Sequence, residues 1–151
     1  MEDSSPEGVH VWLVLMKAVQ AVSRLITADL QGSDLGESDF RVLEVLLHKG
    51  ALPVNTIGPK VNLTPGSISV AVDRLHARGL VSRVEAAGDR RVRMVDLTPE
   101  GRHLIIPVFQ RRADLLERVV SILPPEERVE FEALLKKIGH HAATLGPQPP
   151  L

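Results

Sequence analysis

Near the start of the chain, from Val9 to Leu30, apolar residues recur at steps of three and four without an intervening Gly or Pro. This spacing predicts a long amphipathic helix. A second helix is predicted from Glu37 or Ser38 to Leu47, before Lys49-Gly50. A third, short helix is expected near Thr56 to Val61. Pro59 fits that helix only in its first turn, where the missing N–H has no intrahelical partner.

The fourth helix has a clear start, because Thr64 offers a hydroxyl N-cap and Pro65 suits the first helical position. The helix is predicted to run to Ala77 and to stop at Gly79. Its buried stripe should be Ile68, Ala71, Val72 and Leu75, which leaves Gly66, Ser67, Ser69, Val70, Asp73 and Arg74 facing outward. Small residues and hydroxyls are unusual on a solvent-facing helix, which normally carries more Glu and Lys.

Two short β-branched runs follow, Leu80 to Val84 and Val92 to Leu97. They predict a β-hairpin whose loop, Glu85 to Arg91, has a basic tip. Two helices are predicted after the hairpin, from Pro99 to about Leu123 with a kink at Pro107, and from Glu126 to near Leu145. Residues 147–151 are expected to form a disordered tail.

The predicted fold class is mainly α with a small β-hairpin. A short helix, a tight turn, a hydroxyl-faced helix and then a basic hairpin describe a winged helix-turn-helix. This order of elements favours duplex DNA as the partner, since such a helix can enter the major groove.

Composition limits the other possibilities. The chain of 151 residues is long enough for one domain with a real core and short for two. Cysteine is absent, which excludes disulfides, thiolate metal sites and sensing of oxidants through a thiol. No uninterrupted apolar run approaches the roughly 18 residues of a membrane helix, and the acidic start lacks the basic region of a signal peptide. We therefore expect a soluble, cytoplasmic protein with no membrane partner.

The basic charge lies in the middle of the chain, although the net charge is −1. Between Lys60 and Arg102 there are eight Lys or Arg residues against five Asp or Glu. Arg90 and Arg91 at a hairpin tip suit a narrow minor groove, whose negative potential attracts guanidinium groups. A solvated charged loop is the alternative for an isolated Asp-Arg-Arg segment, and the preceding helix-turn-helix favours the DNA contact.

On the fourth helix, Ser67 and Ser69 can donate to phosphates or base edges, and Gly66 and Val70 leave room for close approach. Thr64 caps the helix, and a helix N-terminus also binds phosphate. The remaining arginines could contact phosphates or form surface ion pairs within the protein; they are Arg74, Arg78 and Arg83.

The stretch from Phe40 to Leu104 resembles the MarR family of bacterial regulators. The resemblance rests on Asp73-Arg-Leu-His-Ala-Arg-Gly-Leu80, then Asp89-Arg-Arg91, then Leu97-Thr-Pro-Glu-Gly-Arg102, in that order. The passages Trp12-Leu-Val-Leu-Met-Lys17 and His48-Lys-Gly-Ala-Leu-Pro-Val54 look closest to the MhqR-like branch, which responds to quinones and phenols.

The resemblance implies a homodimeric regulator of transcription, most simply a repressor, that reads a pseudo-palindromic operator. It divides the single domain 1–151 into a helical dimerisation region, residues 9–36 and 99–146, and a winged helix-turn-helix, residues 37–98. The helix from Thr64 would enter the major groove, and the wing would reach the minor groove. Within the wing, Arg91 would enter the groove while Asp89 braces it by an ion pair.

A ligand site is expected where the long helices meet the winged region. Its candidate residues are Trp12, Met16, Arg24, Phe40, His48 and Phe109, with core or dimer packing as the alternative for the aromatic ones. Apolar walls near Arg24 and His48 would suit a small phenolic or aromatic acid as effector. No metal is expected, because no His-x-x-x-His pair is present, and no cofactor is predicted.

Two other functions compete with a DNA-binding regulator. A winged helix need not bind DNA, so a protein-interaction module is the main alternative. A hydrolase is the second, but no nucleophile elbow or phosphate loop accompanies the Ser, His and Asp residues. The sequence therefore predicts that the protein is not an enzyme.

Overall fold

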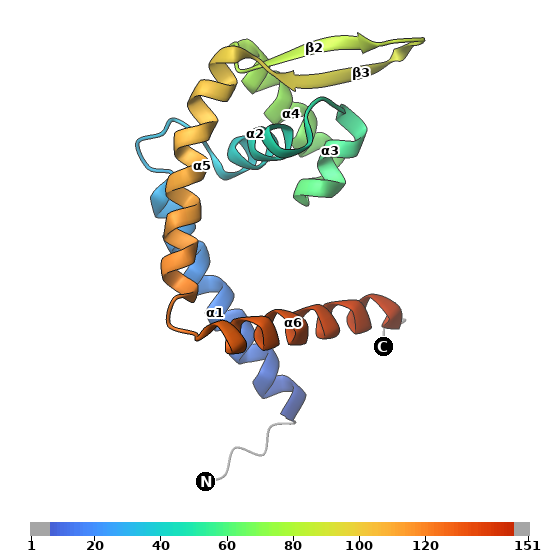
Figure 1. Cartoon of the computed structure of the whole chain (residues 1–151). Coiled ribbons are helices and arrows are strands. Elements are labelled where there is room, and N and C mark those ends of the chain that lie inside the picture. Colours follow the sequence, from blue (N-terminus) through green and yellow to red (C-terminus); the bar gives the residue numbers. More distant parts are fainter. Residues whose placement is uncertain (1–6, 147–151) are drawn as a thin grey trace. The chain divides into compact units, whose positions relative to one another are not determined.

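The computed structural model describes residues 7–146, in nine helices and strands (Figure 1). The chain forms two compact units, residues 1–113 and 114–151, and their boundary falls inside helix α5 (Pro99–Val120). The first unit holds α1 (Glu7–Asp29), α2 (Glu37–Lys49), α3 (Val54–Val61), α4 (Pro65–Ala77) and a three-stranded sheet. The second holds the end of α5 and α6 (Pro125–Leu145). The expected tail, residues 147–151, lies outside the described residues.

The core of the first unit is built where α2, α3 and α4 pack together. Phe40, Leu43 and Leu46 of α2 are fully buried, and they share one face because they recur at helical spacing. The stripe predicted for α4, Ile68, Ala71, Val72 and Leu75, is buried as expected. Burial of this aliphatic stripe against the core turns the opposite face of α4 toward solvent.

The sheet has the order β1-β3-β2, with strands β1 (Leu52–Pro53), β2 (Val81–Ala86) and β3 (Asp89–Leu97), all antiparallel. Strands β2 and β3 form the hairpin beside α4 that is seen in Figure 1. Its register shifts near the tip, where Glu85 pairs with Arg93 but Ala86 pairs with Asp89. Three residues of β3, Arg90 to Val92, therefore lie opposite this single step as an irregular bulge, which turns the chain locally.

Three expectations about these elements were wrong. β1 was missed, β3 begins at Asp89 rather than Val92, and Arg90 and Arg91 therefore belong to a strand rather than to a loop. Helix α3 starts at Val54, so Pro59 is its sixth residue and lies beyond the first turn. The helix ends soon after Pro59, at Asn62, a left-handed cap whose N–H donates to the Gly58 carbonyl.

The first turn of α5 is fastened to the winged region through Thr98. Its hydroxyl donates to the Gly79 carbonyl at 2.6 Å and accepts from the Gly101 N–H at 3.0 Å. The Thr98 N–H also donates to the Leu80 carbonyl. Gly101 is buried against that same carbonyl, and no larger residue fits there because an added Cβ would lie 1.9 Å from its oxygen.

Helix α1 has no buried residue, although it is rich in Val, Leu and Ala. An 18-residue stretch of it has a mean hydropathy of 1.4, so by length and composition it is apolar enough to cross a membrane. This differs from the sequence expectation, which considered only uninterrupted apolar runs. A single helix near the N-terminus is weak evidence for a span, because both the buried core helix of a soluble protein and a signal sequence pass the same test.

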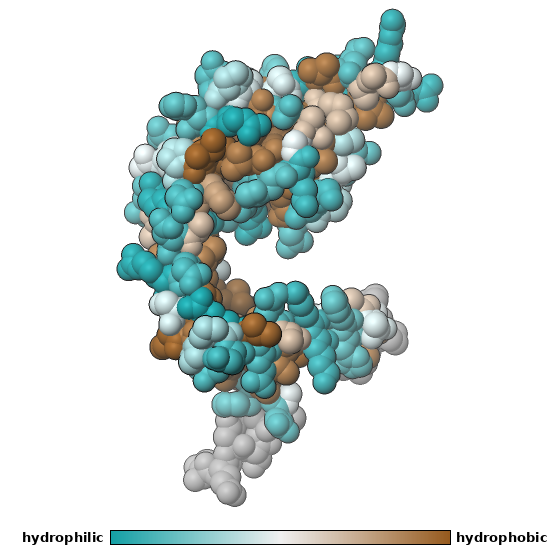
Figure 2. Space-filling model, in the orientation of Figure 1, coloured by the Kyte–Doolittle hydropathy of each residue, from teal (hydrophilic) through white to brown (hydrophobic). Residues whose placement is uncertain are grey.

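In the second unit, α6 also has no buried residue. Apolar side chains reach its surface among the polar ones, as Figure 2 shows. The exposed ones are Val129, Phe131, Leu134, Leu135, Ile138 and Leu145. Phe131, Leu134 and Ile138 are three and four residues apart, so they lie on one side of the helix.

Candidate nucleic-acid interface

The N-terminus of α4 is capped as predicted. Thr64 Oγ1 accepts a hydrogen bond from the Ser67 N–H at 3.2 Å and donates one to Ser67 Oγ at 2.9 Å. Ser69 Oγ donates to the Pro65 carbonyl at 3.0 Å. Both serine hydroxyls therefore have a local partner when no DNA is bound, yet each keeps lone pairs for a further contact.

The outward face of α4 is open. Gly66, Ser67, Ser69 and Val70 are all exposed, and among residues 7–146 nothing beyond the adjoining residues and nearby helix backbone lies within 4 Å of where a Gly66 Cβ would be. The small side chains leave the helix backbone close to whatever approaches this face. The structure thus brings together the helix residues that the sequence nominated for reading base edges.

The predicted phosphate-binding arginines have partners within the protein. Arg74 on α4 donates through Nε to Asp39 Oδ2 of α2 at 2.9 Å and through Nη2 to Ser38 Oγ at 3.3 Å. The hydrogen bond to Asp39 raises the pKa of the Arg74 guanidinium. Because Asp39 is buried, this pair joins the two helices and fixes α4 against the core.

Arg78 and Arg83 are held in a similar way. Arg78 Nη1 donates to the Asp34 carbonyl at 2.7 Å, and Arg83 of β2 forms an ion pair with Asp73 of α4. These arginines, like Arg74, secure α4 to its surroundings. A phosphate contact by any of them stays a prediction, and it would share the guanidinium with the existing partner.

The wing residues have a different arrangement. Asp89 Oδ1 accepts from the backbone N–H of Arg91 at 2.9 Å, and no ion pair joins the Asp89 and Arg91 side chains in the described part of the chain. The ion-pair brace expected of Asp89 is not formed in this arrangement without DNA, and its role in a DNA complex stays a prediction. Asp89 instead fixes the backbone of the bulge, because an Asp side chain readily bonds an amide two residues on.

The guanidinium groups of Arg90 and Arg91 are exposed and, within residues 7–146, have neither an ion pair nor a hydrogen bond. The Arg93 side chain is likewise exposed and has no ion pair or hydrogen bond among these residues, and the sequence analysis did not predict it as a site residue. Its position on the same strand, two residues after Arg91, is the signal that could have identified it, since alternate strand residues share a face. The wing thus presents three exposed arginines that form no ion pair within residues 7–146.

A hollow of about 510 Å³ lies among α3, the start of α4 and strand β3 of the wing. Its walls include Pro65, Ile68 and Ser69 of the α4 region and Arg91 and Arg93 of β3. Ser69 of the small face of α4 therefore shares one concave surface with Arg91 and Arg93 of the wing and with Asn55 and Gly58 of α3.

The expected ligand residues are only partly brought together. The His48 and Phe109 rings meet edge to face, with centroids 4.7 Å apart. Trp12 is 57% exposed on α1, where Met16 is half-buried and Arg24 is exposed. Phe40 is 1% exposed, and the Arg112 guanidinium lies 4.3 Å above its ring centroid. A ligand therefore cannot reach Phe40 in this arrangement.

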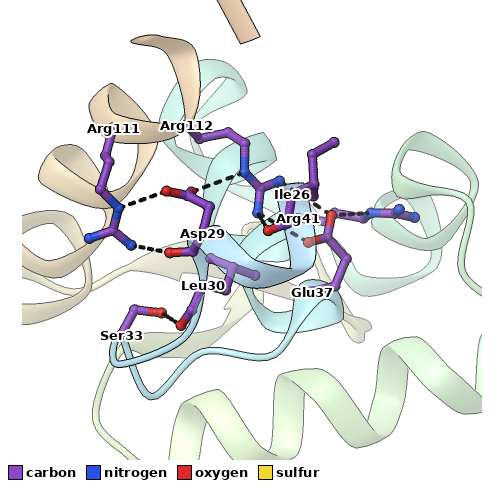
Figure 3. A network of polar contacts seen from close by, with 8 residues as sticks. All are labelled: Ile26, Asp29, Leu30, Ser33, Glu37, Arg41, Arg111 and Arg112. Carbon is purple, nitrogen blue, oxygen red and sulfur yellow. Dashed lines mark hydrogen bonds and ion pairs between the residues drawn. The ribbon is translucent and has the colours of Figure 1, made fainter. Parts of the chain in front are cut away.

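A polar network occupies the junction of α1, α2 and α5, as Figure 3 shows. Arg112 is 5% exposed and pairs with Asp29 at 3.4 Å and with Glu37 at 3.2 Å, while its Nη2 donates to the Ile26 carbonyl. Arg111 also pairs with Asp29, and Arg41 with Glu37. Sequence reasoning missed this network, because its members are up to 86 positions apart.

Metal chemistry finds no support in the described residues. Between residues 7 and 146, no group of three or more His, Asp or Glu side chains could hold a metal ion.

Comparison with known proteins agrees with this geometry. A model of the MarR family matches residues 33–92, which include α2 to the bulge of β3. The transcription regulator MhqR of Bacillus subtilis is 31% identical over 90% of this chain and 94% of its own length. The MarR protein of Salmonella typhimurium is 28% identical over 88% of this chain and 90% of its own.

Among solved structures, BpsR of Bordetella bronchiseptica, whose DNA binding is regulated by 6-hydroxynicotinic acid, is similar. It has a TM-score of 0.76 and 27% identity, with 86% of this chain and 98% of BpsR covered. These relatives are regulators rather than enzymes. The chain belongs to the MarR family, and it is a DNA-binding regulator of transcription.

Proposed function

We propose that the protein is a homodimeric, ligand-responsive repressor that works in the cytoplasm and reads a pseudo-palindromic operator. The observation that carries the DNA-binding part is the exposed small face of α4 together with the exposed wing arginines, which have no partner among the described residues. Arg91 inserts into the minor groove, while Ser67 and Ser69 read base edges in the major groove.

A second copy of the chain is the partner proposed for the exposed apolar helices. Soluble monomers rarely expose large contiguous apolar patches, and α1 and α6 each leave a set of Val, Leu and aromatic side chains uncovered. We assign these surfaces to a dimer interface, with residues 9–36 and 99–146 as the dimerisation region. Two winged regions, residues 37–98, then read half-sites about one helical turn apart.

The dimer is tested by sedimentation equilibrium at micromolar concentration. Leu134→Glu should shift the protein toward monomer, because it puts a charge among apolar side chains of α6. His140→Glu is the matched control, since at 100° per residue it points to another side of the same helix. A wild-type monomer, or equal effects of the two variants, would argue against this interface.

The effector is proposed to be a small phenolic or aromatic acid that favours one dimer geometry over another. Regulation of BpsR by 6-hydroxynicotinic acid supports this class of ligand. The absence of cysteine leaves no thiol to respond to oxidants. The site proposed for this acid is a crevice lined by Trp12, Met16, Arg24, His48 and Phe109, and it excludes Phe40 because that ring is buried. A DNA-release assay should respond to hydroxylated aromatic acids and not to peroxide, and release by peroxide alone would contradict the proposal.

Fluorescence anisotropy with labelled duplex DNA tests the interface itself. Affinity should fall steeply with salt, because phosphate binding releases counterions. Ser67→Ala and Ser69→Ala should narrow the difference in affinity between selected and random DNA more than Arg78→Ala does, since base contacts specify while phosphate contacts position. Equal losses on both DNAs for all three variants would exclude α4 as the reader.

A further inference from the structure

Val70 differs from the other large apolar residues of α4, because it takes no part in the core. Its exposed fraction is 59%, whereas Ile68, Val72 and Leu75 are buried. The structure describes every residue of α4, and Val70 is the one large apolar side chain of this helix that is exposed. A β-branched residue also has a lower helix propensity than alanine. Val70 therefore adds little to the packing of the fold and slightly disfavours its own helix.

Two polar neighbours of Val70 are held by partners inside the protein. Ser69 Oγ donates to the Pro65 carbonyl at 3.0 Å, which uses the single donor of that hydroxyl. Asp73, three positions after Val70, forms an ion pair with Arg83 of β2. The positive charge of the arginine offsets the repulsion that a carboxylate on this face would exert on DNA phosphates. The surface around Val70 can therefore approach a polyanion.

The turn before Val70 leaves its methyl groups uncovered. The Cα–Cβ bonds of a helix tilt toward its N-terminus, so a side chain lies over the turn that precedes it. Four positions before Val70 is Gly66, which has no side chain, and three positions before it is Ser67, which is small and exposed. A base edge can therefore reach the valine methyl groups without meeting a longer side chain on that turn.

We propose that Val70 reads a thymine in each half-site of the operator, through contact of its isopropyl group with the C5 methyl group. This inference rests on the proposed function, which places α4 in the major groove. Thymine is the only one of the four DNA bases that presents a methyl group there, and apolar side chains recognise it by contact.

The chemistry of valine disfavours the other bases at that position. Valine has no hydrogen-bonding group, so it cannot satisfy the donors and acceptors of a purine edge. A purine facing Val70 would lose water without gaining a partner, which costs free energy. Cytosine presents a hydrogen where thymine presents the methyl group, so the apolar contact would be smaller. The expected order of preference is thymine, then cytosine, then either purine.

Replacement of thymine by deoxyuridine tests the contact, because it removes the C5 methyl group and keeps the hydrogen bonds of the base pair. The probe is the duplex most enriched from a random pool, with its thymines replaced in symmetric pairs and its affinity measured by fluorescence anisotropy. At one pair the wild type should lose about fourfold in affinity for each half-site, or about fifteenfold in all, as expected for one buried methyl group per half-site.

Val70→Ala should bind the thymine duplex more weakly and should lose the deoxyuridine penalty at that pair alone. Ser67→Ala is the matched control, since it changes an exposed neighbour on the same helix and should keep the penalty. Val70→Ala should also melt at the same temperature as the wild type or slightly higher, because Val70 lies outside the core. Selection with Val70→Ala should recover a motif that has lost its preference for thymine at one position of each half-site.

The proposal is overturned if no deoxyuridine pair weakens binding, or if wild type and Val70→Ala show the same penalty at every pair. It is also overturned if Ser67→Ala removes the penalty, since the loss would then reflect a displaced helix. After any of these results, a steep salt dependence of binding to the enriched duplex would leave the proposed function standing. If the random pool yields no enriched duplex, sequence-specific binding fails and the role of Val70 fails with it.

Discussion

Arg112→Met is the substitution whose cost can be worked out most fully from the structure. The guanidinium contacts Asp29, Glu37, the Ile26 carbonyl and the face of Phe40. Met keeps much of the length and apolar volume but removes every polar contact. Since Arg112 is almost fully buried, water cannot replace these contacts freely.

Neither carboxylate would be left without a partner. Asp29 keeps Arg111 at 2.8 Å, and Glu37 keeps Arg41 at 3.2 Å. The cost should therefore stay below the roughly 3–5 kcal/mol typical of orphaning a buried charge. The variant still loses the hydrogen bond to the Ile26 carbonyl and the cation–π contact with Phe40. We therefore expect it to be destabilised by about 2–3 kcal/mol.

Urea unfolding followed by far-ultraviolet circular dichroism, at one fixed protein concentration, measures this cost. Arg111→Met is the matched control. That side chain is 51% exposed, so its loss should cost under about 1 kcal/mol. The double variant leaves Asp29 without either arginine and should cost more than the sum of the two. Equal costs for the two single variants, or strict additivity, would refute the buried network.

Three further outcomes follow from the described geometry. Gly101→Ala should destabilise the fold by about 2–4 kcal/mol, because the new Cβ meets the Leu80 carbonyl. Gly139→Ala has open space around it and should stabilise the fold by about 0.5–1 kcal/mol. Equal melting temperatures of the two variants would contradict this expectation. Because burial raises the pKa of Glu44, its ionisation disfavours the folded state. The melting temperature of Glu44→Gln relative to wild type should therefore rise as the pH is raised from below about 4.5 to 7, and a pH-independent difference would contradict the assignment. Arg91→Ala should weaken DNA binding by about 1–3 kcal/mol and lower the salt slope by about one unit, and an unchanged salt titration would exclude the wing contact.

Local chemistry explains what the sequence predicts well. The start of α4 follows from Thr64 and Pro65 alone, and its buried stripe follows from helical spacing. The small, exposed face of this helix could be predicted for the same reason. Each of these features depends on residues within about four positions of one another.

The missed features depend on distant partners. β1 is only Leu52–Pro53, too short for an alternating pattern, and exists because it pairs with β3 more than forty positions later. Arg74 is of a residue type that often contacts phosphate, but in the structure it forms an ion pair with Asp39 of α2. The Arg112 network and the partial burial of Glu44 likewise arise only when α2, α3 and α5 pack together.

Selection from a pool of random duplex DNA, followed by sequencing of the retained fragments, tests the central claim most directly. A dimer that reads base edges with α4 and the minor groove with its wing should enrich one pseudo-palindrome, with half-site centres about one helical turn apart. The same selection with Arg91→Ala should recover the motif with weaker enrichment. Retention of fragments without a shared motif, or of a single half-site without its inverted copy, would contradict a homodimeric, sequence-specific regulator.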